Sequence, residues 1–242
     1  MTAGAPPSEP AISIVIPVYN EEGILRAAVV DLRERLSPLG WHYEILLAEN
    51  GSRDRTVAIG HELERKYPEV RLLETGEPNY GKALRLGIMA ARGEIVLCDE
   101  IDLCDANFHQ QAVELLAQGD ADMVIGSKLI EGAEDERPLV RHVASQLYTA
   151  LLRGLLGFRG TDTHGLKAFR KSKLEGIASD CLTDKDVFAS EFVIRAYRQG
   201  LRVLEVPIRV IEKRPPSINL FKRVPNVIKN IGKLTWAIRL RG

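Results

Sequence analysis

The feature that most constrains the fold of this chain is a regular alternation of short apolar runs with longer amphipathic segments. Runs typical of strands occupy residues 12–17, 44–48, 70–75, 94–98 and 123–126. Segments with helical periodicity lie between them, over 24–36, 56–66, 82–91 and 107–118. Short strands that alternate with helices are typical of βαβ units. The pattern therefore predicts an α/β fold with a mostly parallel sheet flanked by helices.

Polar clusters follow four of these predicted strands. They read "PVYNEE", "ENGSRD", "TGEPNYG" and "DEIDLCD", and each begins where an apolar run ends. In open parallel sheets, ligands bind outside the carboxyl ends of the strands. We therefore expect the four clusters to line a single crevice.

The last of these clusters belongs to a stretch with five carboxylates in twelve residues, 94–105. If residues 98–103 stay extended, alternate side chains face opposite ways. Ile101 then points to the core, and Glu100 and Asp102 point into the crevice. Two carboxylates on one face suit a hard divalent cation, Mg²⁺ or Mn²⁺. The alternative is an acidic strand end that is merely solvated.

Length and composition fit one α/β domain, or one domain with a small appendage. The chain has 242 residues, of which 45% are hydrophobic. Residues 1–11 are rich in Pro and Ala and are predicted to be a disordered tail, not a signal peptide. No apolar stretch reaches the roughly 18–20 residues that span a bilayer. Three cysteines without metal-ligand spacing favour reduced thiols and a cytoplasmic location.

Charge is distributed unevenly along the chain. The 33 Lys/Arg and 33 Asp/Glu balance, yet the last thirty residues carry eight basic and no acidic side chains. Apolar residues recur there at helical spacing, and a basic amphipathic helix with a Trp is typical of a membrane interface. We therefore predict contact with a membrane surface through 217–240. The alternative is a helix packed on the domain. Nucleic-acid binding is not expected, because no reading motif accompanies the basic residues.

Three segments carry a resemblance to a known family: "ISIVIPVYNEE", "EILLAENGSRDRT" and "YGKALRLGIMAARGEIVLCDEIDL". Together they resemble the family 2 glycosyltransferases with the GT-A fold, most closely dolichyl-phosphate mannose synthases and related polyprenyl-phosphate glycosyltransferases. Those enzymes move a sugar from a nucleotide diphosphate to a lipid phosphate. The resemblance implies a catalytic domain over 12–215, with a nucleotide-binding half at 12–105 and an acceptor half at 106–215. A basic segment at 216–242 follows it.

The resemblance also implies which residues contact the nucleotide: Pro17, Tyr19, Glu21, Asn50, Asp54, Lys82 and Glu100. Asn50 stands where the family usually has an Asp that reads the base edge. Glu100 replaces the first Asp of the metal-binding pair, and Cys104 replaces a Gln common in the mannose synthases. Glutamate still ligates a metal. Asparagine brings a donor as well as an acceptor, so an altered base preference is expected.

In the acceptor half, Lys128 closes a Gly-Ser-Lys that resembles the family's Gly-Ser-Arg, and Ser145 follows Arg141 by four residues. Positions i and i+4 share a helix face. We therefore expect Lys128, Arg141 and Ser145 to bind the acceptor phosphate. The alternative makes Arg141 a solvated residue that pairs with Glu134 or Glu136.

Three further positions belong to the resemblance. Arg214 corresponds to an Arg that reaches the phosphates; its alternative is a surface charge before two prolines. His164 stands where Ser is usual, and is either a structural residue or a proton-transfer group. Glu191, at the start of a predicted helix, matches a Glu of the family.

These features predict an inverting, metal-dependent transferase that uses a nucleotide sugar and a polyprenyl phosphate at the cytoplasmic face of a membrane. A phosphate nucleophile is already anionic, so catalysis consists of holding two polyanions together, with Asp102, Lys128, Arg141 and Arg214 in that role. A soluble or glycan hydroxyl acceptor is the first alternative. It requires a base, for which the candidates are Asp162, His164, Asp184 and Asp186. A catalytically silent nucleotide-binding homologue is the second.

Overall fold

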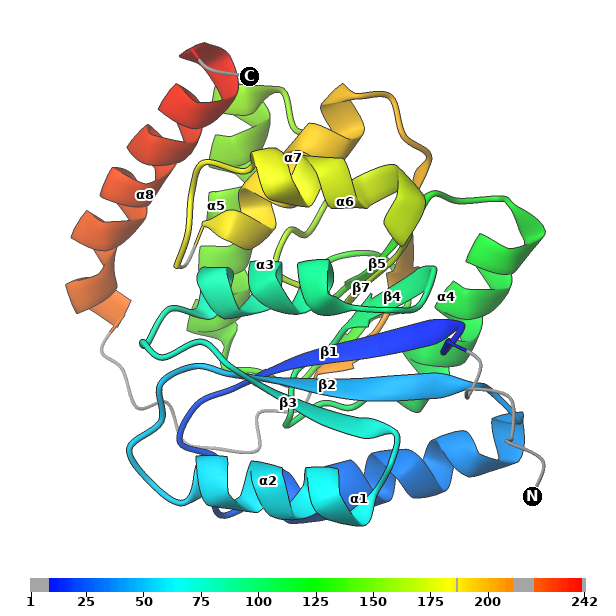
Figure 1. The fold of residues 1–242 in the computed structure, drawn as a ribbon. Coiled ribbons are helices and arrows are strands. Elements are labelled where there is room, and N and C mark those ends of the chain that lie inside the picture. Colours follow the sequence, from blue (N-terminus) through cyan, green and yellow to red (C-terminus); the bar gives the residue numbers. More distant parts are fainter. Residues whose placement is uncertain (1–8, 186, 211–219, 241–242) are drawn as a thin grey trace, which may run out of the picture.

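The protein forms three layers, with a seven-stranded sheet between two layers of helices (Figure 1). The computed structural model describes residues 9–185, 187–210 and 220–240. The strands of the central sheet are β1 (Ile12–Val18), β2 (Tyr43–Glu49), β3 (Val70–Glu74), β4 (Ile95–Cys98), β5 (Met123–Ser127), β7 (Lys167–Arg170) and β8 (Val203–Pro207). A second, parallel pair joins β6 (Glu134–Asp135) to β9 (Arg209–Val210).

The strand order in the central sheet is β3-β2-β1-β4-β7-β5-β8. Neighbouring strands run parallel except at β7, which is antiparallel to both β4 and β5. The predicted mostly parallel sheet is therefore confirmed. The carboxyl ends of β1, β2, β3 and β4 meet at one edge, which is where the four polar clusters begin.

The helices are α1 (Leu25–Leu36), the short 3-10 helix η1 (Ser37–Leu39), α2 (Thr56–Lys66), α3 (Tyr80–Ala90), α4 (Ala106–Gln118), α5 (Leu139–Leu156), α6 (Lys171–Asp180), α7 (Phe188–Arg198) and α8 (Leu220–Leu240). The helices and strands predicted from periodicity up to residue 126 agree with these bounds within two residues.

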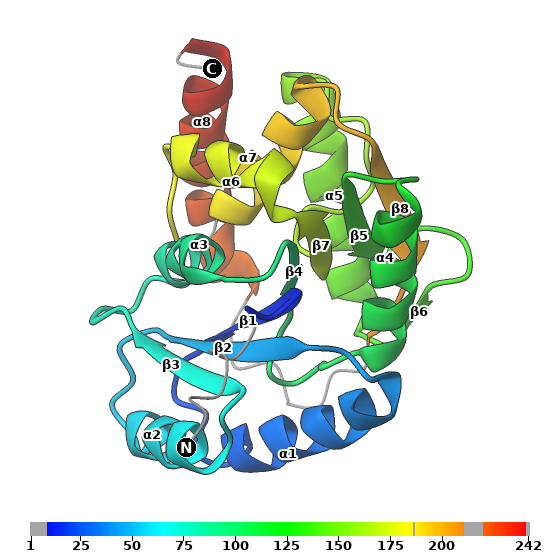
Figure 2. The ribbon, with the colours of Figure 1, turned by 45° about the vertical axis from the view of Figure 1, so that its right-hand side comes forward.

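The alternation of side chains along β1 explains the layers. Ile14 and Ile16 are buried on one face with residues of α1, α2 and α4, whereas Val15 is buried on the other with residues of α3. Helices α5, α6, α7 and α8 add to the α3 side. Figures 1 and 2 show α1 and α2 below the sheet and α3, α6 and α7 above it.

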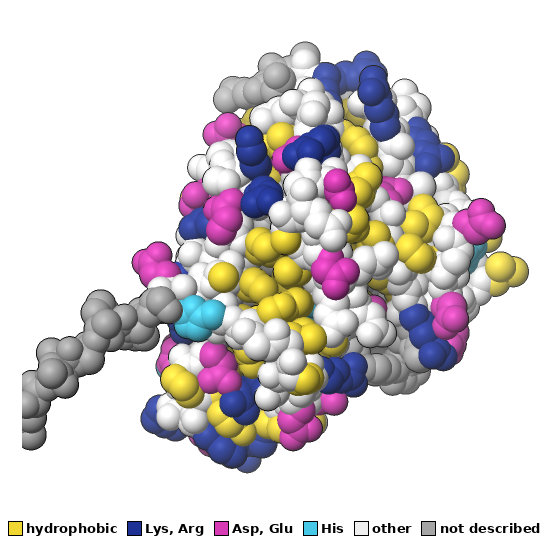
Figure 3. Space-filling view, turned by 90° about the vertical axis from the view of Figure 1, so that its right-hand side faces the viewer, with side chains coloured by type: hydrophobic (Ala, Val, Ile, Leu, Met, Phe, Trp, Pro, Cys, Tyr) yellow, Lys and Arg dark blue, Asp and Glu magenta, His cyan; other side chains and the backbone are white. Residues whose placement is uncertain are grey.

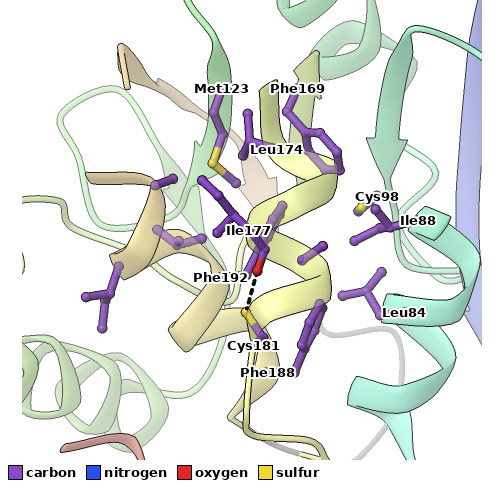
Figure 4. Packing of buried hydrophobic residues seen from close by; sticks show 14 of the residues in the cluster. Leu84, Ile88, Cys98, Met123, Phe169, Leu174, Ile177, Cys181, Phe188 and Phe192 are labelled. Carbon is purple, nitrogen blue, oxygen red and sulfur yellow. Dashed lines mark hydrogen bonds between the residues drawn. The ribbon is translucent and has the colours of Figure 1, made fainter. Parts of the chain in front are cut away.

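The α3 side of the core is built from aromatic and branched side chains, as Figure 4 shows. Phe188 and Phe192 stack with ring centroids 5.8 Å apart, and Ile177 of α6 packs beside them. Each such side chain contributes about 1.5–3 kcal/mol through burial. Cys181 is buried here, and its Sγ donates to Ile177 O at 3.2 Å. The three cysteines are free and buried, as the sequence predicted for reduced thiols.

The C-terminal helix α8 departs from the prediction of a membrane-facing apolar stripe. Ile231, Leu234 and Ile238 are buried against the domain, where α8 contacts α5 and α7. Arg198 of α7 donates to Ile238 O at 2.6 Å. In this part of the helix the alternative, packing on the domain, is the observed state, because these side chains complete the α3-side core. Trp236 remains 47% exposed.

Two other predictions bear on the ends of the chain. Most of the predicted tail 1–11 lies outside the described residues, although Ala11 N donates to His42 O at 2.9 Å. Among the described helices, none is both long enough and apolar enough to cross a membrane.

Candidate functional site

The five carboxylates of residues 94–105 have different roles. Glu94 accepts a hydrogen bond from Ser172. Asp105 caps α4 by accepting from two backbone N–H groups of its first turn. Asp99 Oδ2 lies 2.6 Å from His109 Nε2, and neither side chain is exposed; the other oxygen of Asp99 accepts from Glu100 N at 2.6 Å. Glu100 and Asp102 therefore remain as the candidates for a ligand.

The segment that carries these two carboxylates is a turn. Leu103 N and Cys104 N both donate to Glu100 O, at 2.9 and 3.1 Å. The prediction of an extended 98–103 is therefore wrong: β4 ends at Cys98, and the chain folds back to start α4. The prediction that Ile101 is buried is confirmed. Glu100 and Asp102 are both partly exposed on this turn.

Two lysines lie among these carboxylates. Lys128, directly after β5, contacts Asp162 with Nζ–Oδ2 at 2.6 Å. Lys167 of β7 is buried, and its Nζ donates to Gly165 O at 2.6 Å. Burial and the charge of Asp102 raise the pKa of Glu100 to about 7, while the two lysines oppose the rise. These charged groups thus form one electrostatic cluster at the carboxyl ends of β4 and β5.

Sequence reasoning missed two members of this cluster. Lys167 lies opposite Cys98 in the β4–β7 ladder, and burial lowers its pKa although Cys98, Asp162 and Glu100 act to raise it. The surrounding protein and the charge of Glu100 raise the pKa of Tyr80, at the start of α3, above its usual value, although 37% of its surface stays exposed. The sequence does contain a signal for Lys167, since it is a lysine within the otherwise apolar run "LKAF".

The turns after β1 and β2 form one hydrogen-bonded unit. Asn20 N donates to Ser52 Oγ at 2.9 Å. Asp54 accepts from Thr56 N at 2.9 Å and from Glu22 N at 3.1 Å. Burial raises the pKa of Asp54, but these hydrogen bonds outweigh it and the pKa lies below its usual value. Asp54 therefore stabilises the shape of this edge.

The other residues expected at the nucleotide surround this unit. Pro17 lies in β1, and Tyr19 follows the strand with 39% of its surface exposed. Glu21 N donates to the side chain of Thr56 at 2.7 Å. The Lys82 ammonium is on the first turn of α3 and pairs with Glu77 at 2.6 Å. Their roles toward a nucleotide stay predictions.

Asn50 and Asn79 form a buried junction at the same edge. Asn50 Oδ1 accepts from the backbone N–H of Asn79. The Asn79 carboxamide accepts from Lys82 N at 3.0 Å and from Lys185 N at 2.9 Å, and it donates to Asp184 Oδ2 at 3.0 Å. The junction therefore connects the end of β2, the first turn of α3 and the segment before α7.

The segment before α7 is held from both sides. Glu191 is fully buried and accepts from Leu182 N at 3.0 Å and Thr183 N at 2.7 Å. On the other side, a Cβ added to Gly81 would lie 2.6 Å from Lys185 O, so only glycine permits this close approach of α3. Because these contacts hold the residues on both sides of Asp184, they fix its position next to the first turn of α3.

At the start of α5, two arginines and a serine lie together. Ser145 Oγ donates to Arg141 O at 3.0 Å and accepts from Arg137 at 3.4 Å. Arg137 pairs with both oxygens of Asp135 at 2.7 Å, and His142 contacts the same carboxylate at 3.0 Å. The guanidinium of Arg137 holds the pKa of Asp135 well below its usual range. Binding of a phosphate by Arg141 and Ser145 stays a prediction.

Three acids were expected either to pair with Arg141 or to act as a general base, and the structure gives each of them a contact with another residue. Glu134 and Glu136 pair with Arg209, at 3.0 and 2.7 Å. Asp162 accepts from His164 N at 2.8 Å as well as from Lys128, and the charge of Lys128 outweighs burial and lowers its pKa. Arg214 and Asp186 lie outside the described residues.

Helix α5 has two unlike faces. Toward the domain, Thr149 donates to Thr161 O at 2.8 Å, and the ring of Tyr148 meets His164 edge-on at 5.4 Å. The outer face carries apolar side chains that are 39–76% exposed: Leu139, Val140, Val143, Leu147, Leu151 and Leu155. Because five of the six recur every four residues, they form one stripe, which we call the α5 stripe.

The carboxylates of Glu100 and Asp102 fit a divalent cation that takes only two of its ligands from the protein. Within the described ranges, no group of three or more His, Cys, Asp or Glu side chains is placed to hold a metal. The chain would therefore supply Glu100 and Asp102, and phosphate oxygens and water would supply the rest. Mg²⁺ and Mn²⁺ accept such a shell, and a cation would offset the repulsion that raises the pKa of Glu100.

The fold is the GT-A fold of nucleotide-sugar transferases. It resembles glucosyl-3-phosphoglycerate synthase from Mycobacterium tuberculosis in complex with Mn²⁺ and UDP-glucose, with a TM-score of 0.64 and 21% identity over 95% of this chain and 79% of that one. It also resembles the mannosyltransferase PcManGT from Pyrobaculum calidifontis with GDP-Man and Mn²⁺, with a TM-score of 0.62 and 19% identity over 97% and 65% of the two chains.

Residues 13–177, more than half of the chain, match the model of "Glycosyl transferase family 2", and the chain belongs to that family. Curated relatives include glycosyltransferase AglD from Haloferax volcanii, 28% identical over 95% of this chain and 38% of the relative. Dolichyl-phosphate beta-glucosyltransferase ALG5A from Trichomonas vaginalis is 26% identical over 84% and 66%. The chain spans less than half the length of AglD.

Proposed function

We propose that this chain transfers a sugar from a nucleotide diphosphate sugar to a polyprenyl phosphate at a membrane surface, with inversion at the sugar carbon. The observation that carries the proposal is the cluster of Glu100 and Asp102 with Lys128 and Lys167 at the carboxyl ends of the strands. Such an alternation of charge suits two polyanions that must approach each other.

The donor would lie along the edge formed by the turns after β1 and β2. Asn50 and Tyr19 would border the nucleoside, and the diphosphate would reach the turn with Glu100 and Asp102. A divalent cation held by these two carboxylates would offset the charge that develops on the leaving diphosphate. Tyr80 and Lys82, on the first turn of α3, would lie next to this path.

The chemistry requires little of the chain beyond positioning. An oxygen of the acceptor phosphate attacks the anomeric carbon, the bond to the donor phosphate breaks, and its electron pair leaves with the nucleoside diphosphate. No proton has to move, because the phosphate is already anionic. Lys128, Arg141 and Ser145 would hold the acceptor phosphate in line with the leaving group. Arg137, close to Ser145, is a further candidate.

The helix that would bind the acceptor phosphate also carries an apolar outer face. The α5 stripe is exposed, and α5 and the neighbouring α8 contain no Asp or Glu. Described basic side chains exposed on α8 are Lys229, Lys233 and Arg239, beside Trp236. The face seen in Figure 3 carries side chains of both charges. Apolar and basic groups without acids favour an anionic lipid surface, so membrane contact through α8 is proposed together with α5.

A transfer assay tests the proposal. Wild type, Asp102→Asn, Arg141→Ala and the exposed control Arg35→Ala would be given radiolabelled UDP- and GDP-sugars, Mg²⁺ or Mn²⁺, and polyprenyl phosphate. Lipid-linked product from wild type and the control, strongly reduced in both other variants, is expected. Donor hydrolysis without lipid product, lost only in Asp102→Asn, would move the acceptor to another class. No reaction with any donor would favour a nucleotide-binding role.

One observation favours a hydroxyl acceptor as a second candidate. A cleft of about 350 Å³ opens beside the start of α4, lined by Asp105, Asn107, Phe108, Gln111, Gly132, Glu134, Pro207, Ile208 and Arg209. Its polar lining suits a sugar or another soluble molecule. Against this reading, Asp162 is paired with Lys128 and has a lowered pKa, which makes it a weak base.

A further inference from the structure

The junction between Asn50 and Asn79 fixes which end of the Asn50 carboxamide can meet a ligand. The backbone N–H of Asn79 donates to Asn50 Oδ1. A carboxamide accepts through its oxygen and donates through its nitrogen. The main chain of Asn79 therefore sets the orientation of the Asn50 side chain and occupies its oxygen.

Asn79 cannot easily give up this role, because it is itself fixed. Its side chain is buried and hydrogen-bonded to Lys82 N, Lys185 N and Asp184. A half-turn of the Asn50 carboxamide would place its NH₂ against the N–H of Asn79. Two donors would then face each other and a buried N–H would lose its acceptor, which is unfavourable.

The nitrogen of the same carboxamide is available. Asn50 is only 6% exposed, yet its Nδ2 makes no hydrogen bond with the residues that the structure describes. Among the described residues, the enclosed side-chain atoms that lack a hydrogen-bond partner belong to Asp99, His109 and Thr183. Nδ2 of Asn50 is not among them, so it keeps a path to solvent or to a ligand.

We propose that Asn50 reads the nucleotide base as a hydrogen-bond donor, so that the base atom facing it is an acceptor. The inference rests on the proposed function, in which Asn50 lies at the base. An aspartate here would only accept and would select an N–H; Asn50, with its oxygen engaged, offers only N–H. Cytosine and uracil separate the two cases, because N3 is an acceptor in cytosine and a donor in uracil. With N3 as the base atom that faces Asn50, the contact favours cytosine over uracil.

Binding of CDP and UDP, measured by titration calorimetry with Mg²⁺, tests the proposal on wild type, Asn50→Asp and Asn50→Ala. The ratio of CDP to UDP affinity is expected to fall about ten-fold or more from wild type to Asn50→Asp, with Asn50→Ala between them. The ratio cancels the repulsion between a new carboxylate and the diphosphate, since both ligands carry the same diphosphate.

The outcomes separate this inference from the function on which it rests. An equal ratio in wild type and Asn50→Asp, with nucleotide still bound, would overturn the inference alone. If Asn50→Asp does not fold, Asn50→Ala decides, because unchanged discrimination in that variant has the same meaning. Failure of wild type to bind CDP, UDP or GDP would overturn the proposed function and this inference together.

Discussion

Asn79→Ala is the substitution that best tests how the donor edge is held together. It removes three side-chain hydrogen bonds and keeps the backbone N–H that donates to Asn50. The bond to Lys82 N is the N-cap of α3, and loss of such a cap costs about 1 kcal/mol. Loss of a buried hydrogen bond lowers the free energy of unfolding by about 0.5–1.5 kcal/mol. Loss of the bonds to Lys185 N and Asp184 should lower it by less, because both residues are exposed.

We therefore expect Asn79→Ala to lower the free energy of unfolding by about 2 kcal/mol. Urea unfolding followed by tryptophan fluorescence and circular dichroism measures this value. Asp184→Ala is the matched control, because it removes only one of the three bonds. A double-mutant cycle between the two positions should give a coupling of about 0.5–1 kcal/mol.

Two results would refute the reasoning. A loss below about 0.5 kcal/mol, the range of ordinary surface substitutions, would mean that the junction does not stabilise the fold. Equal losses in Asn79→Ala and Asp184→Ala would mean that the cap of α3 and the bond to Lys185 contribute nothing. Affinity for a nucleotide should also weaken in Asn79→Ala, because the first turn of α3 loses its attachment.

Three further predictions follow from the cluster, the outer helix face and the Asp135 network. Asp102→Asn should lower transfer about 100-fold or more without loss of stability, because it relieves repulsion with Glu100; normal activity would contradict the metal site. Leu147→Glu, at a 61% exposed position of the α5 stripe, should change unfolding by less than about 0.5 kcal/mol yet weaken flotation with anionic vesicles about ten-fold, whereas Leu86→Glu on α3 should not. Asp135→Asn should cost about 1–3 kcal/mol at pH 7. Because Arg137 lowers the folded pKa of Asp135, that stabilisation is fully present above the unfolded pKa of about 4 and is lost progressively as the pH falls from there through the folded pKa. The difference from wild type in urea midpoint should therefore shrink in acid, and a constant difference would contradict the assignment.

The layered fold followed from the sequence because periodicity and burial agree along the first half of the chain. Strand β1 alternates between the two cores, and α2 begins and ends at the predicted residues. Less could be predicted after residue 126. The antiparallel β7 and the two-residue strands β6 and β9 depend on contacts between distant segments, which local patterns do not encode.

In the candidate site, too, local sequence patterns predicted part of the arrangement, and contacts between distant segments determine the rest. Glu100 and Asp102 were selected by an argument from strand parity whose premise fails, since the chain turns after Cys98. In the structure, Glu94, Asp99 and Asp105 contact Ser172, His109 and the first turn of α4, and the role of Glu100 and Asp102 toward a metal stays a prediction. The cap formed by Asp105 is local, but Ser172 lies 78 residues from Glu94 in the chain, and no spacing rule could have named that partner.

Helix α8 illustrates a limit of amphipathic patterns. Apolar residues at helical spacing are equally consistent with a bilayer and with a protein core, because each removes them from water. Here Leu234 and Ile238 pack in the core. The exposed apolar surface lies instead on α5, where helical periodicity alone does not tell an exposed apolar face from a buried one.

The most direct measurement of the central claim is the choice between two acceptors that differ in one group. Wild-type protein would be given its preferred nucleotide sugar and equal amounts of a polyprenyl phosphate and the corresponding polyprenol, and products would be identified by mass spectrometry. The account predicts a glycosyl phosphate lipid and no glycosylated polyprenol, since the nucleophile is a phosphate oxygen and no base is required. Transfer to the polyprenol at a comparable rate, or only to a soluble hydroxyl compound, would contradict it.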